Sequence, residues 1–161
     1  TEGIAARIAT RLADSGAAVD LRRVDQVEAL ETHNAVVFGA PVYDQSWPPE
    51  ADRFVIGHRD ALAAQPLWLF SVGSFGDTKR LIGPLIRKEP KGIVQVRAGI
   101  RPREYRVFQG VIRKHQWPFW SRLFFHAFGG RFGDHREWPV IDAWADQIAL
   151  VLPTLRSTTP A

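Results

Sequence analysis

Hydrophobic and polar positions along the chain form two kinds of pattern. Nearly continuous apolar runs, rich in β-branched and aromatic residues, predict strands at 35–42, 67–72 and 93–100. Continuous apolar runs of this kind are typical of strands that are covered on both faces. A shorter alternating stretch, 17–24, predicts one more strand.

A second set of segments has helical spacing. Ile4, Ile8 and Leu12 predict a helix that begins at the first residue, with Thr1 in the N-cap position and Gly16 as the left-handed stop. Further helices are predicted at 50–64, 80–87, 103–115 and 139–152.

The alternation of strands and helices predicts an α/β fold with a three-layer, open parallel sheet and right-handed crossovers. We expect one domain over residues 1–156, followed by a short polar tail at 157–161. A helix at the first residue should follow a strand, so we expect that the first strand is missing from this chain.

Composition narrows the possible chemistry. The 161 residues are 45% hydrophobic and 24% charged, which suits one globular domain, and they include no cysteine. The absence of cysteine excludes a disulfide framework, a thiolate zinc site and cysteine catalysis within these residues. It is compatible with a reducing, cytoplasmic compartment, which we expect for this protein. The five histidines have no paired spacing and predict no metal site. No apolar run is long enough to span a membrane.

Ligands of open α/β sheets bind beyond the carboxyl ends of the strands. Two loops that follow predicted strands, 39–50 and 71–77, combine glycines, aromatic residues and polar groups. They are suited to a flat, polar ligand. The alternative is that Tyr43 and Trp47 only cap the sheet and that the glycines only turn the chain.

The opening TEGIA resembles the end of the phosphate loop of flavodoxins, and VVFGAPVYDQSWPPEADRFV and WLFSVGSFGD resemble their two flavin loops. The resemblance implies FMN as cofactor and the strand order 2-1-3-4-5, with the first strand and most of the phosphate loop missing here. It implies that Thr1 holds the phosphate. One side of the flavin ring would be lined by Pro41, Val42, Tyr43 and Asp44, and the other by Ser71, Val72, Gly73 and Phe75.

Within this group, RAGIRPREYRVFQGVIRK (97–114) and FGDHREWPVIDAWADQIA are similar to segments of the menaquinone-dependent protoporphyrinogen dehydrogenases. That resemblance implies an FMN-dependent oxidoreductase with a porphyrinogen substrate and a quinone acceptor. The net charge of +4 suits an acidic substrate, for which Arg101, Arg103 and Arg106 are candidate partners. The alternative for each arginine is a solvated face or a surface ion pair. No single acid or base stands out as catalytic.

The stretch 112–132 combines aromatic and basic residues around Pro118. Trp117, Trp120 and Phe124 are candidates for a peripheral membrane contact on the inner face of the membrane. A helix packed on the sheet, or a contact between two copies in a homodimer, explains the same pattern. No nucleic-acid recognition module accompanies it, so no nucleic-acid partner is expected.

Two other functions stay open. The first is a soluble electron carrier of the flavodoxin type, although such carriers are typically acidic and this chain is basic, with a pI of about 10.0. The second is a binding domain that keeps the fold without a flavin.

Overall fold

The computed structural model describes residues 1–43, 46–73, 99–112 and 133–156. In chain order the elements are helix α1 (Glu2–Asp14), a short 3-10 helix η1 (Val24–Gln26), strand β1 (Val36–Pro41), helices α2 (Pro49–Gly57) and α3 (Arg59–Ala64), strands β2 (Leu67–Gly73), β3 (Glu104–Gln109), β4 (Val111–Ile112) and β5 (Gly133–Asp134), and helix α7 (Trp138–Arg156).

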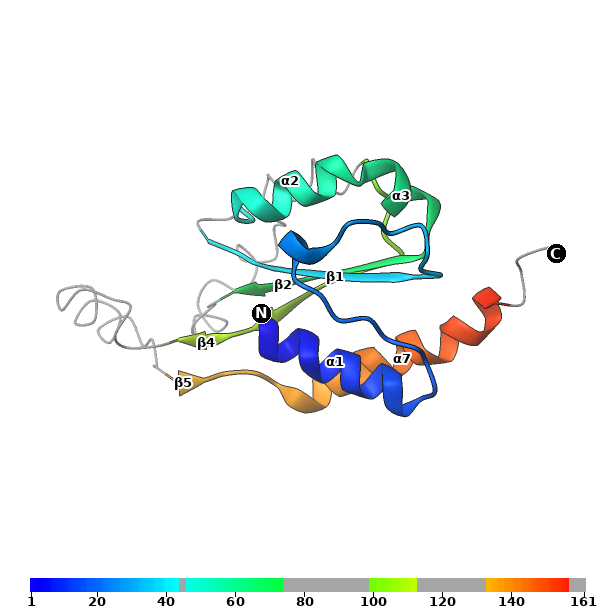
Figure 1. Ribbon diagram of the computed structural model, residues 1–161. Helices are drawn as coiled ribbons and strands as arrows, with labels where there is room; N and C mark the ends of the chain where they lie inside the picture. Colours follow the sequence, from blue (N-terminus) through cyan, green and yellow to red (C-terminus); the bar gives the residue numbers. More distant parts are fainter. Residues whose placement is uncertain (44–45, 74–98, 113–132, 157–161) are drawn as a thin grey trace.

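Three parallel strands form the centre of the fold in the order β1-β2-β3. Helices α2 and α3 cover one face of this sheet, and α1 and α7 cover the other (Figure 1). The three layers confirm the predicted architecture. Strands β1 and β2 take the third and fourth positions of the predicted order 2-1-3-4-5, and β3 takes the fifth position, which was expected for the strand at 93–100. Every residue of β2 is buried, as the continuous apolar run at 67–72 predicts for a central strand.

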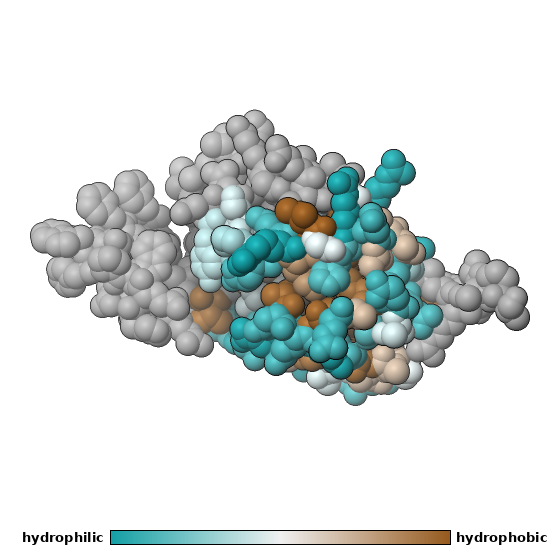
Figure 2. Space-filling view, turned by 45° about the horizontal axis from the view of Figure 1, so that its top comes forward, coloured by the Kyte–Doolittle hydropathy of each residue, from teal (hydrophilic) through white to brown (hydrophobic). Residues whose placement is uncertain are grey.

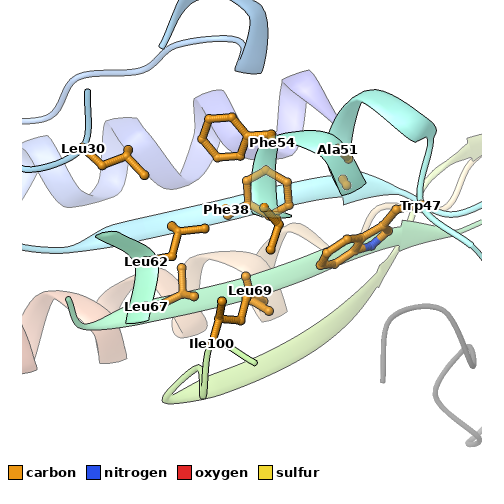
Figure 3. Close-up of a cluster of buried hydrophobic side chains, with 11 residues drawn as sticks. Leu30, Phe38, Trp47, Ala51, Phe54, Leu62, Leu67, Leu69 and Ile100 are labelled. Carbon is orange, nitrogen blue, oxygen red and sulfur yellow. The ribbon is translucent and has the colours of Figure 1, made fainter. Parts of the chain in front are cut away.

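Each face of the sheet has its own hydrophobic core. Under α2 and α3, Leu67 and Leu69 of β2 pack with Phe38, Phe54 and other residues (Figure 3). On the opposite face, Phe70 of β2 packs with the buried faces of α1 and α7. Because side chains alternate along a strand, β2 contributes to both cores. Hydrophilic side chains surround a smaller group of hydrophobic ones on the described surface shown in Figure 2.

The first helix and the last lie side by side and are joined by two ion pairs. Arg7 contacts Asp142 and Arg11 contacts Asp146, each at 2.6 Å. The predicted helix at the start of the chain is confirmed, and Gly16 has the left-handed φ of +91° that ends it.

The predicted helix at 103–115 is wrong over its described residues, 103–112. Residues 104–109 form β3 instead, because they complete the second edge of β2 with six paired positions, from Trp68↔Glu104 to Gly73↔Gln109. The apolar pattern expected for a buried strand is interrupted in this segment by two polar residues. Glu104 and Arg106 face the same side as Phe108, toward α7, where they bond Trp144 and Gln147.

The predicted strand at 17–24 is also corrected, since these residues are not assigned to a strand. Strands need a neighbour about 4.8 Å away, and a cleft of about 420 Å³ lies here instead. Its lining includes residues 17–21 and Val37 of β1. The predicted order places a strand between these two segments.

Two smaller differences concern the middle of the chain. The predicted helix at 50–64 is divided into α2 and α3 at His58, whose φ and ψ of −109° and 21° are not helical. Of the predicted strand at 93–100, residues 93–98 lie outside the described part of the chain. Its last two residues, Gly99 and Ile100, form a turn. The predicted helix at 80–87 lies wholly outside them.

Candidate functional site

The carboxyl ends of the strands bring together residues from both predicted flavin loops. Pro41, at the end of β1, is paired with Val72, near the end of β2. The backbone N–H of Val42 donates to the Val72 carbonyl at 2.8 Å and continues this contact beyond β1. The structure therefore places Pro41 and Val42 beside Ser71, Val72 and Gly73, as expected for one site.

Tyr43 lies on a tight turn directly after this edge. Its N–H donates to the Ser46 carbonyl, and the Ser46 N–H donates to the Tyr43 carbonyl, both at 2.9 Å. The tyrosine is 69% exposed, and it is the one aromatic residue among the exposed large hydrophobic residues of the described ranges. An exposed ring at the carboxyl edge is available to stack on a flat ligand.

The Ser71 side chain lies inside the protein and not at the open edge. It is fully buried, and its hydroxyl oxygen accepts hydrogen bonds from Trp47 Nε1 at 2.8 Å and from Tyr105 Oη at 2.9 Å. The Ser71 hydroxyl is thus engaged inside the protein, and only the backbone at this end of β2 remains for a ligand. Figure 3 shows Trp47 at the end of the core nearest the β2 arrowhead.

The start of α1 lies near the same edge (Figure 1). The Thr1 carbonyl accepts the first helical bonds, from Ile4 and Ala5, so the N–H groups of Glu2 and Gly3 lie ahead of them. Thr1 is exposed and its side chain makes no capping hydrogen bond. A helix start of this kind favours an anion such as a phosphate.

Arg136 is a basic group at this helix start that the sequence analysis did not identify. Its Nη1 lies 2.8 Å from the position that a Cβ on Gly3 would take. The guanidinium bonds Asp134 and lies 4.5 Å from the centroid of the Trp138 ring. This contact with Arg136 lowers the pKa of Asp134 from 3.8 to about 2. The motif GDHREW showed these residues together, but no spacing in it indicated that they approach α1.

The candidate substrate arginines do not gather at this edge. The Arg103 N–H donates to the carbonyl of Leu67, the first residue of β2, so Arg101 and Arg103 lie at the amino ends of the strands. The six residues of β3 separate them from the carboxyl edge by about 20 Å, at about 3.3 Å per residue. Arg106 lies within β3 and is paired with Glu104 at 2.6 Å.

Several predicted residues lie outside the described part of the chain. They are Asp44 and Phe75 of the flavin loops and Trp117, Trp120 and Phe124 of the aromatic stretch. Within the described ranges, the structure has no helix long and apolar enough to span a membrane. The same ranges bring together no group of three potential metal ligands.

The described residues thus form an open, parallel α/β domain with a candidate ligand site at the edge shared by β1, β2 and the start of α1. The chain belongs to the flavodoxin domain family, whose pattern matches residues 1–128. The match shows the family and not the protoporphyrinogen dehydrogenase type within it. No curated protein matches the chain.

Among solved structures, the chain is similar to the rubredoxin oxygen:oxidoreductase (ROO) of the anaerobe Desulfovibrio gigas, with a TM-score of 0.60 and 14% sequence identity. The match covers 98% of this chain and 34% of that one, so the chain spans about a third of its length. At this identity the likeness establishes the fold alone, which is flavodoxin-like.

Proposed function

We propose that this domain binds FMN at the carboxyl edge of its sheet and acts as a flavin-dependent oxidoreductase. Tyr43 carries the proposal, because it is 69% exposed on a turn at this edge, where a flavin ring needs a flat, apolar neighbour. Membership of the flavodoxin domain family supports the choice of FMN.

The described residues fit such a cofactor. The start of α1 offers the N–H groups of Glu2 and Gly3 for a phosphate, with the guanidinium of Arg136 close by. Thr1 adds an exposed hydroxyl at the same place. The ends of β1 and β2 would hold the ring against Tyr43. The bound flavin would supply the electron transfer, while the protein positions it and controls its surroundings.

A porphyrinogen substrate and a quinone acceptor form a narrower proposal, supported by the sequence resemblance of residues 97–114. Because Arg101 and Arg103 lie at the amino edge, they are too far from Tyr43 to hold a substrate against a flavin there. Turnover of protoporphyrinogen with a menaquinone analogue by the flavin-loaded protein tests this proposal. The absence of turnover would leave FMN binding in place and remove this substrate.

The proposed cofactor is tested by the visible absorption spectrum after FMN is added and the excess is removed by gel filtration. The test uses the 161-residue chain and, in parallel, the chain with any residues that its gene encodes before Thr1. A retained flavin spectrum in either form supports the proposal. If neither form retains flavin, the protein is a binding domain that keeps the fold without FMN.

The role of Tyr43 is tested with Tyr43→Ala. Loss of the stacking contact should weaken FMN binding about 2- to 13-fold, since an aromatic pair contributes about 0.5–1.5 kcal/mol. The control is Ile56→Ala on α2, which removes another exposed hydrophobic side chain (67% exposed) away from this edge. Isothermal titration of both variants measures the dissociation constants. Equal constants for Tyr43→Ala and the unmodified protein would refute the placement of the ring.

A further inference from the structure

The hydroxyl of Ser71 joins three separate parts of the chain. It is the one fully buried polar side chain among the residues that the structure describes. Trp47, from the loop after β1, and Tyr105, from β3, both donate to its oxygen, at 2.8 and 2.9 Å. The partners are 24 and 34 residues away in sequence, so the contact exists only in the folded sheet.

The chemistry of the three groups makes this arrangement specific. An indole N–H can only donate, and a hydroxyl oxygen has two lone pairs to accept with. Both lone pairs of Ser71 are used, one by each ring. The Trp47 ring is also packed edge-on against Phe38, with centroids 5.4 Å apart, and is 4% exposed. Its orientation is therefore set by packing on one side and by Ser71 on the other.

Two neighbouring residues of β2 hold the two ends of the Tyr43 turn. Before the turn, the Val42 N–H is bound to the Val72 carbonyl. After the turn, Trp47 is bound to Ser71. Between these points the turn is closed by the paired backbone bonds of Tyr43 and Ser46. Tyr43 is thus exposed on a short segment that is anchored to β2 at both ends.

We propose that Ser71 is a positioning residue, whose hydroxyl acts through Trp47 to hold the Tyr43 turn in the orientation in which the Tyr43 ring meets a flavin. Tyr105 supports the same oxygen from β3. The identity of the ligand, FMN, rests on the proposed function. The anchoring of the turn is argued from the hydrogen bonds alone.

The anchoring is tested first without flavin. Amide hydrogen exchange of Tyr43 and Ser46, followed by NMR, reports on the closure of the turn. Ser71→Ala leaves the buried indole N–H without its acceptor, and we expect exchange at both amides to become at least about tenfold faster. Tyr105→Phe removes one of the two bonds to Ser71 from a half-buried ring, and a smaller acceleration is expected. This variant provides the test if Ser71→Ala does not fold.

The control for a general loss of stability is Ile148→Val, which shortens a buried side chain of α7 on the opposite face of the sheet. It should leave exchange at Tyr43 and Ser46 unchanged. If Ile148→Val accelerates these amides as much as Ser71→Ala does, or if neither Ser71→Ala nor Tyr105→Phe accelerates them, the anchoring role is refuted.

The flavin is then added to the same variants. We expect Ser71→Ala to raise the dissociation constant of FMN about 3- to 10-fold and to shift the midpoint potential of bound FMN, whereas Ile148→Val changes neither. Faster exchange in Ser71→Ala with unchanged FMN affinity and potential would overturn the link to the flavin. Failure of the unmodified protein to bind FMN would instead refute the proposed function, and the exchange data would still decide the anchoring.

Discussion

Replacement of Gly39 by alanine should destabilise the fold strongly, because a side chain at this position has no space. Gly39 of β1 is paired with Phe70 of β2, and a Cβ added to Gly39 would overlap the Phe70 ring. The ring cannot move aside easily. It is 1% exposed and lies against Phe108 and Trp144, with centroid distances of 5.8 and 6.0 Å.

The magnitude follows from this confinement. Overpacking of a core costs about 1–3 kcal/mol when neighbours can adjust, and occasionally more. Because Phe70 is held on both sides, we expect Gly39→Ala to lower the free energy of unfolding by about 3 kcal/mol. For a protein of this size, that corresponds to a fall in Tm of about 6–12 °C. Urea and thermal unfolding followed by circular dichroism measure both quantities.

Gly57, at the end of α2, provides the matched control. A Cβ added there meets nothing within 4 Å, so Gly57→Ala should be neutral or stabilise by up to about 1 kcal/mol. A second variant, Phe70→Leu, should reduce the cost of Gly39→Ala. The double variant should therefore lose less unfolding free energy than the sum of the losses in the two single variants. A loss below about 0.5 kcal/mol for Gly39→Ala would show that the Phe70 ring is free to move aside.

Two further predictions concern the face of α7 and the start of α1. Trp144→Phe should lower the free energy of unfolding by about 2 kcal/mol, because Glu104 then loses the indole donor at 2.7 Å; a loss below about 0.5 kcal/mol in urea would contradict this. In an NMR titration, the pKa of Asp134 should be about 2 and should rise toward 3.8 in Arg136→Gln. Since the folded pKa is the lower one, the ion pair contributes above about pH 4 and is lost as the pH falls toward 2. An unchanged pKa in Arg136→Gln would exclude the ion pair as its cause.

The sequence predicted the central part of the fold because its signals were local and strong. Continuous apolar runs marked β1 and β2, and helical spacing marked α1 and α7. The signal for β3 was weaker, since Glu104 and Arg106 occupy positions that face α7. Their polar groups are satisfied by Trp144 and Gln147, which no pattern within residues 104–109 reveals.

The candidate site was predictable in part for a similar reason. Topology alone places the loops after β1 and β2 at one edge, so Tyr43 and Val72 were identified together. The partners of Ser71 depend on the register of β3 and on the path of the loop that carries Trp47, and neither is encoded in a short motif. The positions of Arg101 and Arg103 depend on β3. Because residues 104–109 form a strand beside β2 and not a helix, these two arginines lie at the amino edge of the sheet.

FMN is proposed to bind at the carboxyl edge of the sheet. The most direct test is amide hydrogen exchange of the protein with and without FMN, read by mass spectrometry over the whole chain. We expect slower exchange at residues 42–46 and 71–73 and at the start of α1, with no change at residues 99–103 at the opposite edge. Equal exchange with and without FMN, or protection at residues 99–103 in place of the carboxyl edge, would contradict this placement.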